Sequence, residues 1–68
     1  MNKKEAAYWF REASLQGDAD AQYMLGLCYA SGEGVAKNAH KAKKWLKEAS
    51  RQGHKLAQNI LARIHETW

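Results

Sequence analysis

The 68-residue sequence has no proline and only one cysteine, Cys28. A lone cysteine cannot close a disulfide within the chain, and the lack of a disulfide favours a reducing compartment. Residues with branched β-carbons, which favour strands, are also scarce: they are Val35, Ile60, Ile64 and Thr67. Alanine, lysine, glutamate, glutamine and leucine, all good helix formers, dominate the rest. The composition therefore predicts an all-α protein.

Long apolar runs are absent as well. The longest uncharged stretch, Ala21–Gly32, has 12 residues, whereas a membrane-spanning helix needs about 20. The N-terminal apolar run, Ala6–Phe10, is shorter than the core of about 7–15 residues in a secretory signal. We therefore expect no membrane association and a cytoplasmic location. The sequence leaves open a secreted parent chain or a fragment of a longer protein.

What the sequence does contain is an internal repeat with a constant offset of 36 residues. When Ala6–Gly26 is aligned with Ala42–Ala62, ten of the 21 positions are identical, whereas average composition gives about one or two matches. Periods of 20–50 residues are typical of solenoids and repeat arrays. The repeat thus points to stacked units and to binding rather than chemistry.

Each copy of the repeat reads as a helix, a glycine turn and a second helix. Gly17 and Gly53 stand where a helix must stop, and glycine accepts the left-handed conformation of a helix C-cap. Asp18 is a good N-cap, His54 is a poorer one, and Asn38 is a natural N-cap after the loop at 31–38. Helical spacing predicts four antiparallel helices at about 3–15, 19–30, 39–51 and 55–66.

The apolar residues at helical spacing are expected to face inward. They are Ala6, Trp9, Phe10, Ala13, Ala21, Met24, Leu25, Cys28, Ala42, Trp45, Leu46, Ala49, Ala57, Ile60, Leu61 and Ile64. A chain of this length forms one domain at most and buries only about 60% of its unfolded surface, so its stability is marginal. Aromatic residues at the ends, such as Trp9 and Trp68, indicate either self-association through exposed solenoid ends or rings that fold back over the core. We favour the second interpretation.

The pattern AxAQxxLGxxYxxGxGVxxNxxxAxxWxxxAxxxG runs from Ala19 to Gly53. It resembles the Sel1-like repeat, a relative of the tetratricopeptide repeat. The resemblance implies one domain over 1–68, with one full repeat at about 19–53 between half repeats at 1–18 and 54–68. Where the first copy has Gly26, the second has Ala62, so the last helix is either a degenerate cap or the start of a longer array. Cys28 lacks the partner cysteine that links the helices in some secreted members.

The resemblance further implies an α-α superhelix that binds a protein or peptide as an adaptor or scaffold. In this family the first helix of each unit lines the concave side, which here means the helices at 19–30 and 55–66. The residues that this assignment turns toward the concave face are Asp20, Tyr23, Leu27, Asn59, Arg63 and Glu66. They would form a shallow peptide groove with an aromatic anchor. The alternative is that Tyr23 only fills the packing between units.

Basic residues gather on the outer side of the helix at 39–51. They are Lys37, His40, Lys41, Lys44, Lys47 and Arg51. With a net charge of +4, this face would suit a small regulator or inhibitor, such as a toxin-neutralising immunity-type protein, that binds an acidic partner. The alternative, which we favour, is a solvated face on which Lys44 supports Glu48. Nucleic acid is not expected as a partner, because no binding motif is present and Trp9 and Trp45 are assigned to the core.

No catalytic, metal or cofactor site is expected. The three histidines lie on different elements without the spacing of metal ligands, and Cys28 falls on an inner face where a thiol behaves as a small hydrophobe. The glycine-rich GEGV segment lacks the GK[ST] ending of a phosphate loop and follows a helix instead of a strand. The sequence therefore predicts a protein that binds and does not catalyse.

Overall fold

The computed structural model describes residues 2–67, and their side chains as far as Ile64. Residues 2–67 form four helices and contain no strand, which confirms the all-α prediction. The helices are α1 (Lys3–Leu15), α2 (Ala19–Ser31), α3 (Ala39–Arg51) and α4 (Lys55–Thr67). The expected bounds of α1 and α3 are confirmed, and α2 and α4 are each one residue longer than expected.

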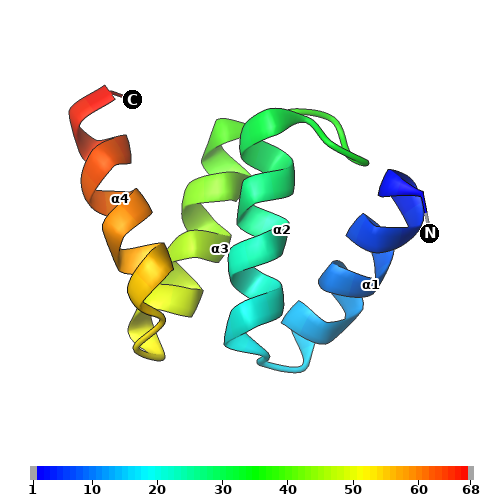
Figure 1. The fold of residues 1–68 in the computed structure, drawn as a ribbon, viewed down its shortest axis with the longest axis horizontal. Coiled ribbons are helices and arrows are strands. Elements are labelled where there is room, and N and C mark those ends of the chain that lie inside the picture. Colours follow the sequence, from blue (N-terminus) through cyan, green and yellow to red (C-terminus); the bar gives the residue numbers. More distant parts are fainter. Residues whose placement is uncertain (1, 68) are drawn as a thin grey trace.

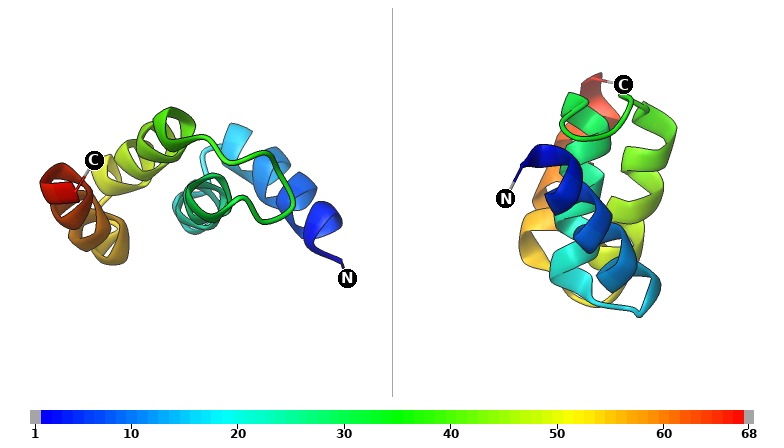
Figure 2. Two further views of the ribbon diagram at one scale, coloured as in Figure 1. Left: turned by 90° about the horizontal axis from the view of Figure 1, so that it is seen from above. Right: turned by 90° about the vertical axis from the view of Figure 1, so that its right-hand side faces the viewer.

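The four helices stand side by side in chain order along the 32 Å long axis of the molecule (Figure 1). Each helix packs against the next one along the chain. Seen from above in Figure 2, α2 and α4 lie on one side and α3 on the other, while α1 slants away at the far end. The first and last helices therefore each have a flank that no other described helix covers.

The two glycine turns have the same geometry, as the repeat requires. Gly17 and Gly53 have φ angles of 92° and 87°. In both turns the backbone N–H of the third residue after the helix donates to the carbonyl five residues earlier: Asp18 N to Ala13 O and His54 N to Ala49 O, each at 3.2 Å. This is the Schellman arrangement, in which a glycine with positive φ ends the helix. The sequence repeat is thus a structural repeat.

Side-chain caps begin the first three helices. Asn2, Asp18 and Asn38 each accept a hydrogen bond from the backbone N–H three residues on, at 2.8, 3.0 and 3.0 Å. Such caps satisfy backbone donors that have no partner within the helix. The expected capping roles of Asp18 and Asn38 are confirmed.

The glycine-containing loop between α2 and α3 folds back over the start of α1 (Figure 1). A Cβ atom at Gly34 would collide with the backbone carbonyl of Lys3 and would lie 3.0 Å from the Ala7 Cβ. Only glycine permits this approach of backbone to backbone. The GEGV segment therefore packs closely against the start of α1.

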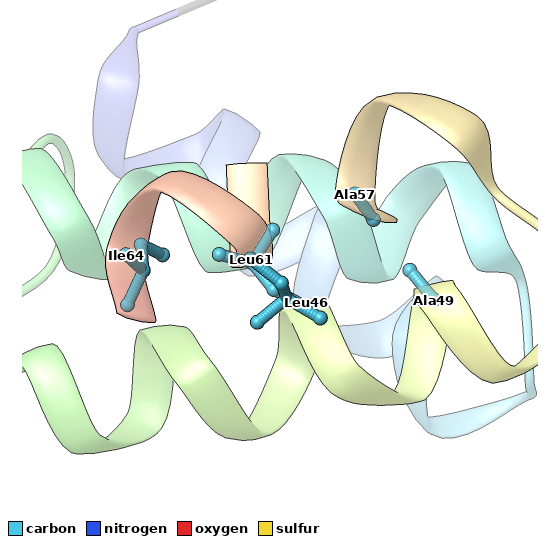
Figure 3. Packing of buried hydrophobic residues seen from close by; sticks show 5 residues of the cluster. All are labelled: Leu46, Ala49, Ala57, Leu61 and Ile64. Atoms are coloured by element: carbon cyan, nitrogen blue, oxygen red, sulfur yellow. The ribbon is translucent and has the colours of Figure 1, made fainter. Parts of the chain in front are cut away.

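The main hydrophobic cluster lies between α3 and α4 (Figure 3). It consists of Leu46, Ala49, Ala57, Leu61 and Ile64, of which the first three are fully buried. Alanines at this contact let the two helices approach closely while the larger side chains fill the remaining space. The predicted inner faces of α3 and α4 are confirmed, although Trp45 and Ile60 are only half-buried.

The predicted inner face of α1 is wrong in part. Trp9 is 57% exposed, so it is not a core residue, and the buried residues of α1 are Ala7 and Ser14. Tyr8 is 55% exposed and packs edge-on against Trp9. The physical reason is that α1 is covered by α2 and the loop on one flank only. The favoured interpretation, in which the terminal rings fold back over the core, is therefore wrong for these two aromatics; Trp68 lies outside the described residues.

Candidate interaction surfaces

On the side of the molecule formed by α2 and α4, two residues predicted for the concave face, Asp20 and Tyr23, meet the side chain of His54. The Tyr23 ring stacks on the His54 ring, with 4.6 Å between centroids and 22° between planes. Asp20 Oδ1 lies 3.0 Å from His54 Nε2, and its side chain is 90% exposed. Tyr23 also packs against the α3–α4 cluster. It is half-buried, so it fills the junction between units and leaves part of its ring accessible.

His54 fixes this junction through both of its ring nitrogens. Nδ1 accepts a hydrogen bond from the backbone N–H of Ala57 at 3.2 Å, so Nδ1 carries no proton in this arrangement. The other ring nitrogen, Nε2, lies 3.0 Å from Asp20 Oδ1. His54 thus caps α4 and ties it to α2. Sequence reasoning rated His54 a poorer cap than Asp18, and nothing in the spacing showed that Asp20 would be its partner.

The other predicted concave residues are spread more widely. Leu27 is half-buried on α2, whereas Asn59 and Arg63 are exposed on α4. The side chain of Glu66 lies outside the described residues. The structure therefore brings Asp20 and Tyr23 together through His54, and it sets Asn59 and Arg63 one repeat further along the solenoid.

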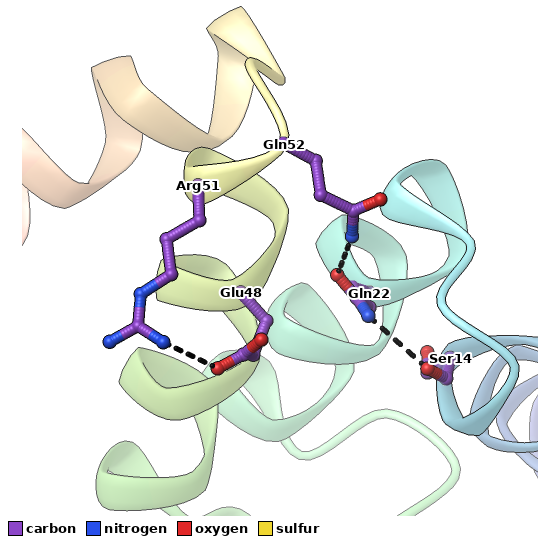
Figure 4. Close-up of polar contacts among 5 residues, drawn as sticks. All are labelled: Ser14, Gln22, Glu48, Arg51 and Gln52. Atoms are coloured by element: carbon purple, nitrogen blue, oxygen red, sulfur yellow. Dashed lines mark hydrogen bonds and ion pairs between the residues drawn. The ribbon is translucent and has the colours of Figure 1, made fainter.

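A pair of glutamines connects the two glycine turns (Figure 4). The buried Gln22 side chain donates from Nε2 to the carbonyl of Ser14 at 3.2 Å, and its oxygen accepts from Gln52 Nε2 at 2.8 Å. Gln22 therefore joins the end of α1 to the end of α3. Gln58 is the counterpart of Gln22 in the repeat. Its Nε2 donates to the Ser50 carbonyl at 3.1 Å, as Gln22 Nε2 does to the Ser14 carbonyl. Gln22 and Gln58 are among the ten identical positions of the repeat, but the sequence alone did not indicate this network.

The predicted basic face is exposed along its whole length: Lys37, Lys41, Lys44, Lys47 and Arg51. Lys37 lies in the loop before α3, so only the other four belong to the helix. Glu48 pairs with Arg51 at 3.2 Å (Figure 4), whereas the sequence had placed it beside Lys44. The ammonium group of Lys44 instead lies 5.8 Å from the centre of the Trp45 ring.

Two shallow hollows accompany these basic residues. One, of 270 Å³, is formed along α3 itself. Its lining residues are His40, Lys43, Lys44, Lys47, Glu48 and Arg51. The other, of 230 Å³, lies between α1 and α3. Its lining residues are Arg11, Leu15, Tyr29, Lys41, Lys44 and Trp45. Arg11 thus joins the basic face from a different helix, which the helical spacing of 39–51 alone could not show.

A third hollow, of 340 Å³, opens on the free flank of α1 and α2 and is mainly apolar. It is lined by Trp9, Phe10, Ala13, Asp18, Asp20, Ala21 and Met24. Met24, predicted to face inward, is 38% exposed here. The exposed Trp9 and Met24 side chains thus meet in this hollow, while Leu56 is exposed on α4 at the other end of the molecule.

The described residues hold no group of three or more potential metal ligands close enough to bind an ion. Burial raises the pKa of the half-buried Cys28 thiol, and the nearby Glu33 carboxylate raises it further. A raised pKa keeps the thiol protonated and unreactive near neutral pH. Within residues 2–67, no helix combines the length and apolarity that a bilayer crossing requires.

Helix–turn–helix units related by a 36-residue repeat, stacked in chain order with equivalent turns, define a helical repeat protein of the solenoid class. The Sel1 repeat profile matches residues 2–18 and 19–54. The chain belongs to the Sel1 repeat family. It is also similar to the crystal structure of a Sel1 repeat protein from Oxalobacter formigenes, with a TM-score of 0.90 and 38% identity. That match covers 93% of this chain and 26% of the Oxalobacter chain. Comparison with curated proteins gives no match.

Proposed function

We propose that this chain is a non-catalytic interaction module that binds a protein or peptide on the face formed by α2 and α4. Sel1 repeats generally mediate protein interactions. The observation that supports this face is the junction of Asp20, Tyr23 and His54, where an aromatic ring remains partly accessible beside an exposed carboxylate. Rigid aromatic rings beside polar groups are favoured at the centres of interfaces.

The physical basis is that the binding surface is held by the packing of the units. Tyr23 loses little conformational freedom on binding, because His54 and the core cluster already fix its ring. Leu27 lies one helical turn further along α2 and is half-buried, so it extends the same stripe with apolar surface. An extended peptide could contact both side chains and place a cationic or hydroxyl group at Asp20. Preorganised surfaces of this kind bind with a smaller entropy loss.

A displayed library of random peptides tests the proposal. Peptides selected on the immobilised chain are titrated into the isotopically labelled protein, and the amide shifts are mapped. Shifts centred on Tyr23 and Leu27, together with at least tenfold weaker binding by Leu27→Ala, are expected. Lys47→Ala, an exposed change on α3, serves as the matched control. Peptide shifts centred on α3 or on the flank of α1 would refute the assignment.

A second candidate function is supported by the basic hollows on the outer side. Arg11, Lys41 and Lys44 line one hollow together with Tyr29 and Trp45. Such a surface suits an acidic protein segment, as in a regulator or inhibitor. A polyglutamate peptide is the probe: its affinity should fall steeply with salt, since exposed charges are screened within about 8 Å at physiological ionic strength. Binding that is indifferent to salt and to Lys44→Gln would eliminate this function.

A further inference from the structure

The first hairpin, α1–α2, and the second hairpin, α3–α4, are related by the 36-residue repeat. The apolar hollow at the α1 end is the counterpart, on the first hairpin, of the surface that α2 covers on the second. The counterparts of Leu46, Ala49, Ala57 and Ile60 are Phe10, Ala13, Ala21 and Met24. In the second hairpin this surface is closed, with Leu46 and Ala49 fully buried. In the first hairpin it forms the open 340 Å³ hollow. The hollow therefore has the form of a seat for a helix like α2.

We propose that α4 of a second copy of this chain occupies this seat, in the position that α2 takes across α3 and α4. By the repeat, α4 is the counterpart of α2, and α1 is the counterpart of α3. The helices at the two ends of the stack (Figure 1) are thus complementary halves of the same unit. Copies joined head to tail would continue the stacking that already exists within one chain.

The glutamine network supplies one specific contact for this junction. Within the chain, Gln22 is held by the Ser14 carbonyl and by Gln52. Its counterpart Gln58 already has the matching bond to Ser50, and the counterpart of Gln52 is Gln16, at the α1 end. Both Gln58 and Gln16 are exposed. Docking in the α2 position would bring Gln58 of the second copy, through its side-chain oxygen, to Gln16 of the first and complete the network.

Charge also favours this occupant. The seat carries the carboxylates of Asp18 and Asp20. Between residues 55 and 64, α4 contains Lys55 and Arg63 and no acidic residue. Opposite charges on the two ends steer a heterologous contact and disfavour contact between two identical ends.

The junction should be weaker than the packing within one chain, because two positions differ. Asn59 stands where α2 has Tyr23, and Ala62 stands where α2 has Gly26. Gly26 lies so close to Leu46 that an added Cβ would be 2.7 Å from its Cγ, so Ala62 would hold the helices further apart. For a small interface we expect a dissociation constant between about 10 µM and 1 mM. Because the contact is heterologous, it can propagate into longer assemblies.

Complementation between two blocked variants tests the geometry in sedimentation equilibrium. Met24→Glu places a charge in the seat, and Asn59→Glu places one on α4; both positions are exposed. We expect the unaltered chain to self-associate with concentration, each variant alone to stay monomeric, and a mixture of the two to form a one-to-one dimer. Ala39→Glu, an exposed change in the first turn of α3, adds the same charge and should leave association intact.

The proposal is overturned if the unaltered chain is monomeric at about 1 mM, if neither Glu variant reduces association, or if the mixture stays monomeric. A gain-of-function variant tests it from the other direction. Asn59→Tyr combined with Asp18→His would rebuild the Tyr23–His54 stack across the junction. We expect at least tenfold tighter association for this double variant, and an unchanged dissociation constant would contradict the proposed register.

Discussion

The two hairpins, α1–α2 and α3–α4, have nearly the same sequence and the same turn, yet only one of them has a closed core. Ala49 is fully buried, whereas its counterpart Ala13 is half-buried. Ile60 is half-buried, whereas its counterpart Met24 is exposed. The difference comes from the neighbour: α2 lies across the second hairpin, and no described helix lies across the first. Burial in a solenoid is thus set by position in the stack as well as by the residue.

The largest expected effect is the loss of Leu46, which lies at the centre of the α3–α4 cluster. Leu46→Ala should lower the free energy of unfolding by about 2–5 kcal/mol, since it leaves a cavity in a fully buried site. Its counterpart Phe10 is half-buried, so Phe10→Ala should lower it by only about 1–2 kcal/mol. Urea denaturation followed by circular dichroism measures both. Equal losses would show that the two hairpins are equally closed in solution.

Next in size is the contrast between the two glutamines. Gln22 is buried and holds two partners, so Gln22→Ala should lower the free energy of unfolding by about 1–3 kcal/mol, because the Gln52 amide and Ser14 carbonyl lose a partner. Gln58 is exposed and donates a hydrogen bond to the Ser50 carbonyl, so Gln58→Ala should cost about 0.5 kcal/mol or less. The same denaturation assay applies at a concentration where the chain is monomeric. A cost for Gln58→Ala that matches Gln22→Ala would remove the contrast.

At the glycine turns the two hairpins should behave alike. Gly17 and Gly53 both have positive φ, and an added Cβ would meet no atom within 4 Å at either. Only backbone strain then opposes substitution, and a left-handed non-glycine residue costs about 1–2 kcal/mol. Gly17→Ala and Gly53→Ala should therefore lower the midpoint of thermal unfolding by the same amount. A clear difference between them would mean that the turns are not equivalent in solution.

These comparisons also show what the sequence could reveal. The repeat, the glycine turns and the caps at Asp18 and Asn38 are local signals, so the helices and their order follow from spacing and composition. Exposure of Trp9 depends on whether another helix lies over α1, which no local pattern encodes. The same limit applies to the His54–Asp20 contact and to Arg11 beside the α3 lysines, because both join residues from different helices. Helical spacing thus predicted the faces of α3 and α4 correctly and that of α1 only in part, because Trp9 is exposed.

The smallest effect concerns Cys28, whose counterpart in α4 is Ile64. Ile64 is 5% exposed, whereas Cys28 is half-buried. Burial and the Glu33 carboxylate both raise the pKa of the Cys28 thiol, and the thiolate is the reactive form. We expect iodoacetamide to label Cys28 more slowly in the native chain than in urea, at neutral pH.

The same shift fixes a sign for stability against pH. A thiol whose pKa is higher in the folded chain holds its proton there at a pH where the unfolded chain has released it. The contribution of this thiol to the free energy of unfolding is therefore full below its ordinary pKa. That contribution is lost as pH rises toward the pKa of the thiol in the folded chain. Native Cys28 that reacted faster than Cys28 in the unfolded chain would show an activated thiol and would contradict the raised pKa. Glu33→Gln, at an exposed loop position, should lower the pKa and modestly speed native labelling, since only the smaller of the two causes is removed.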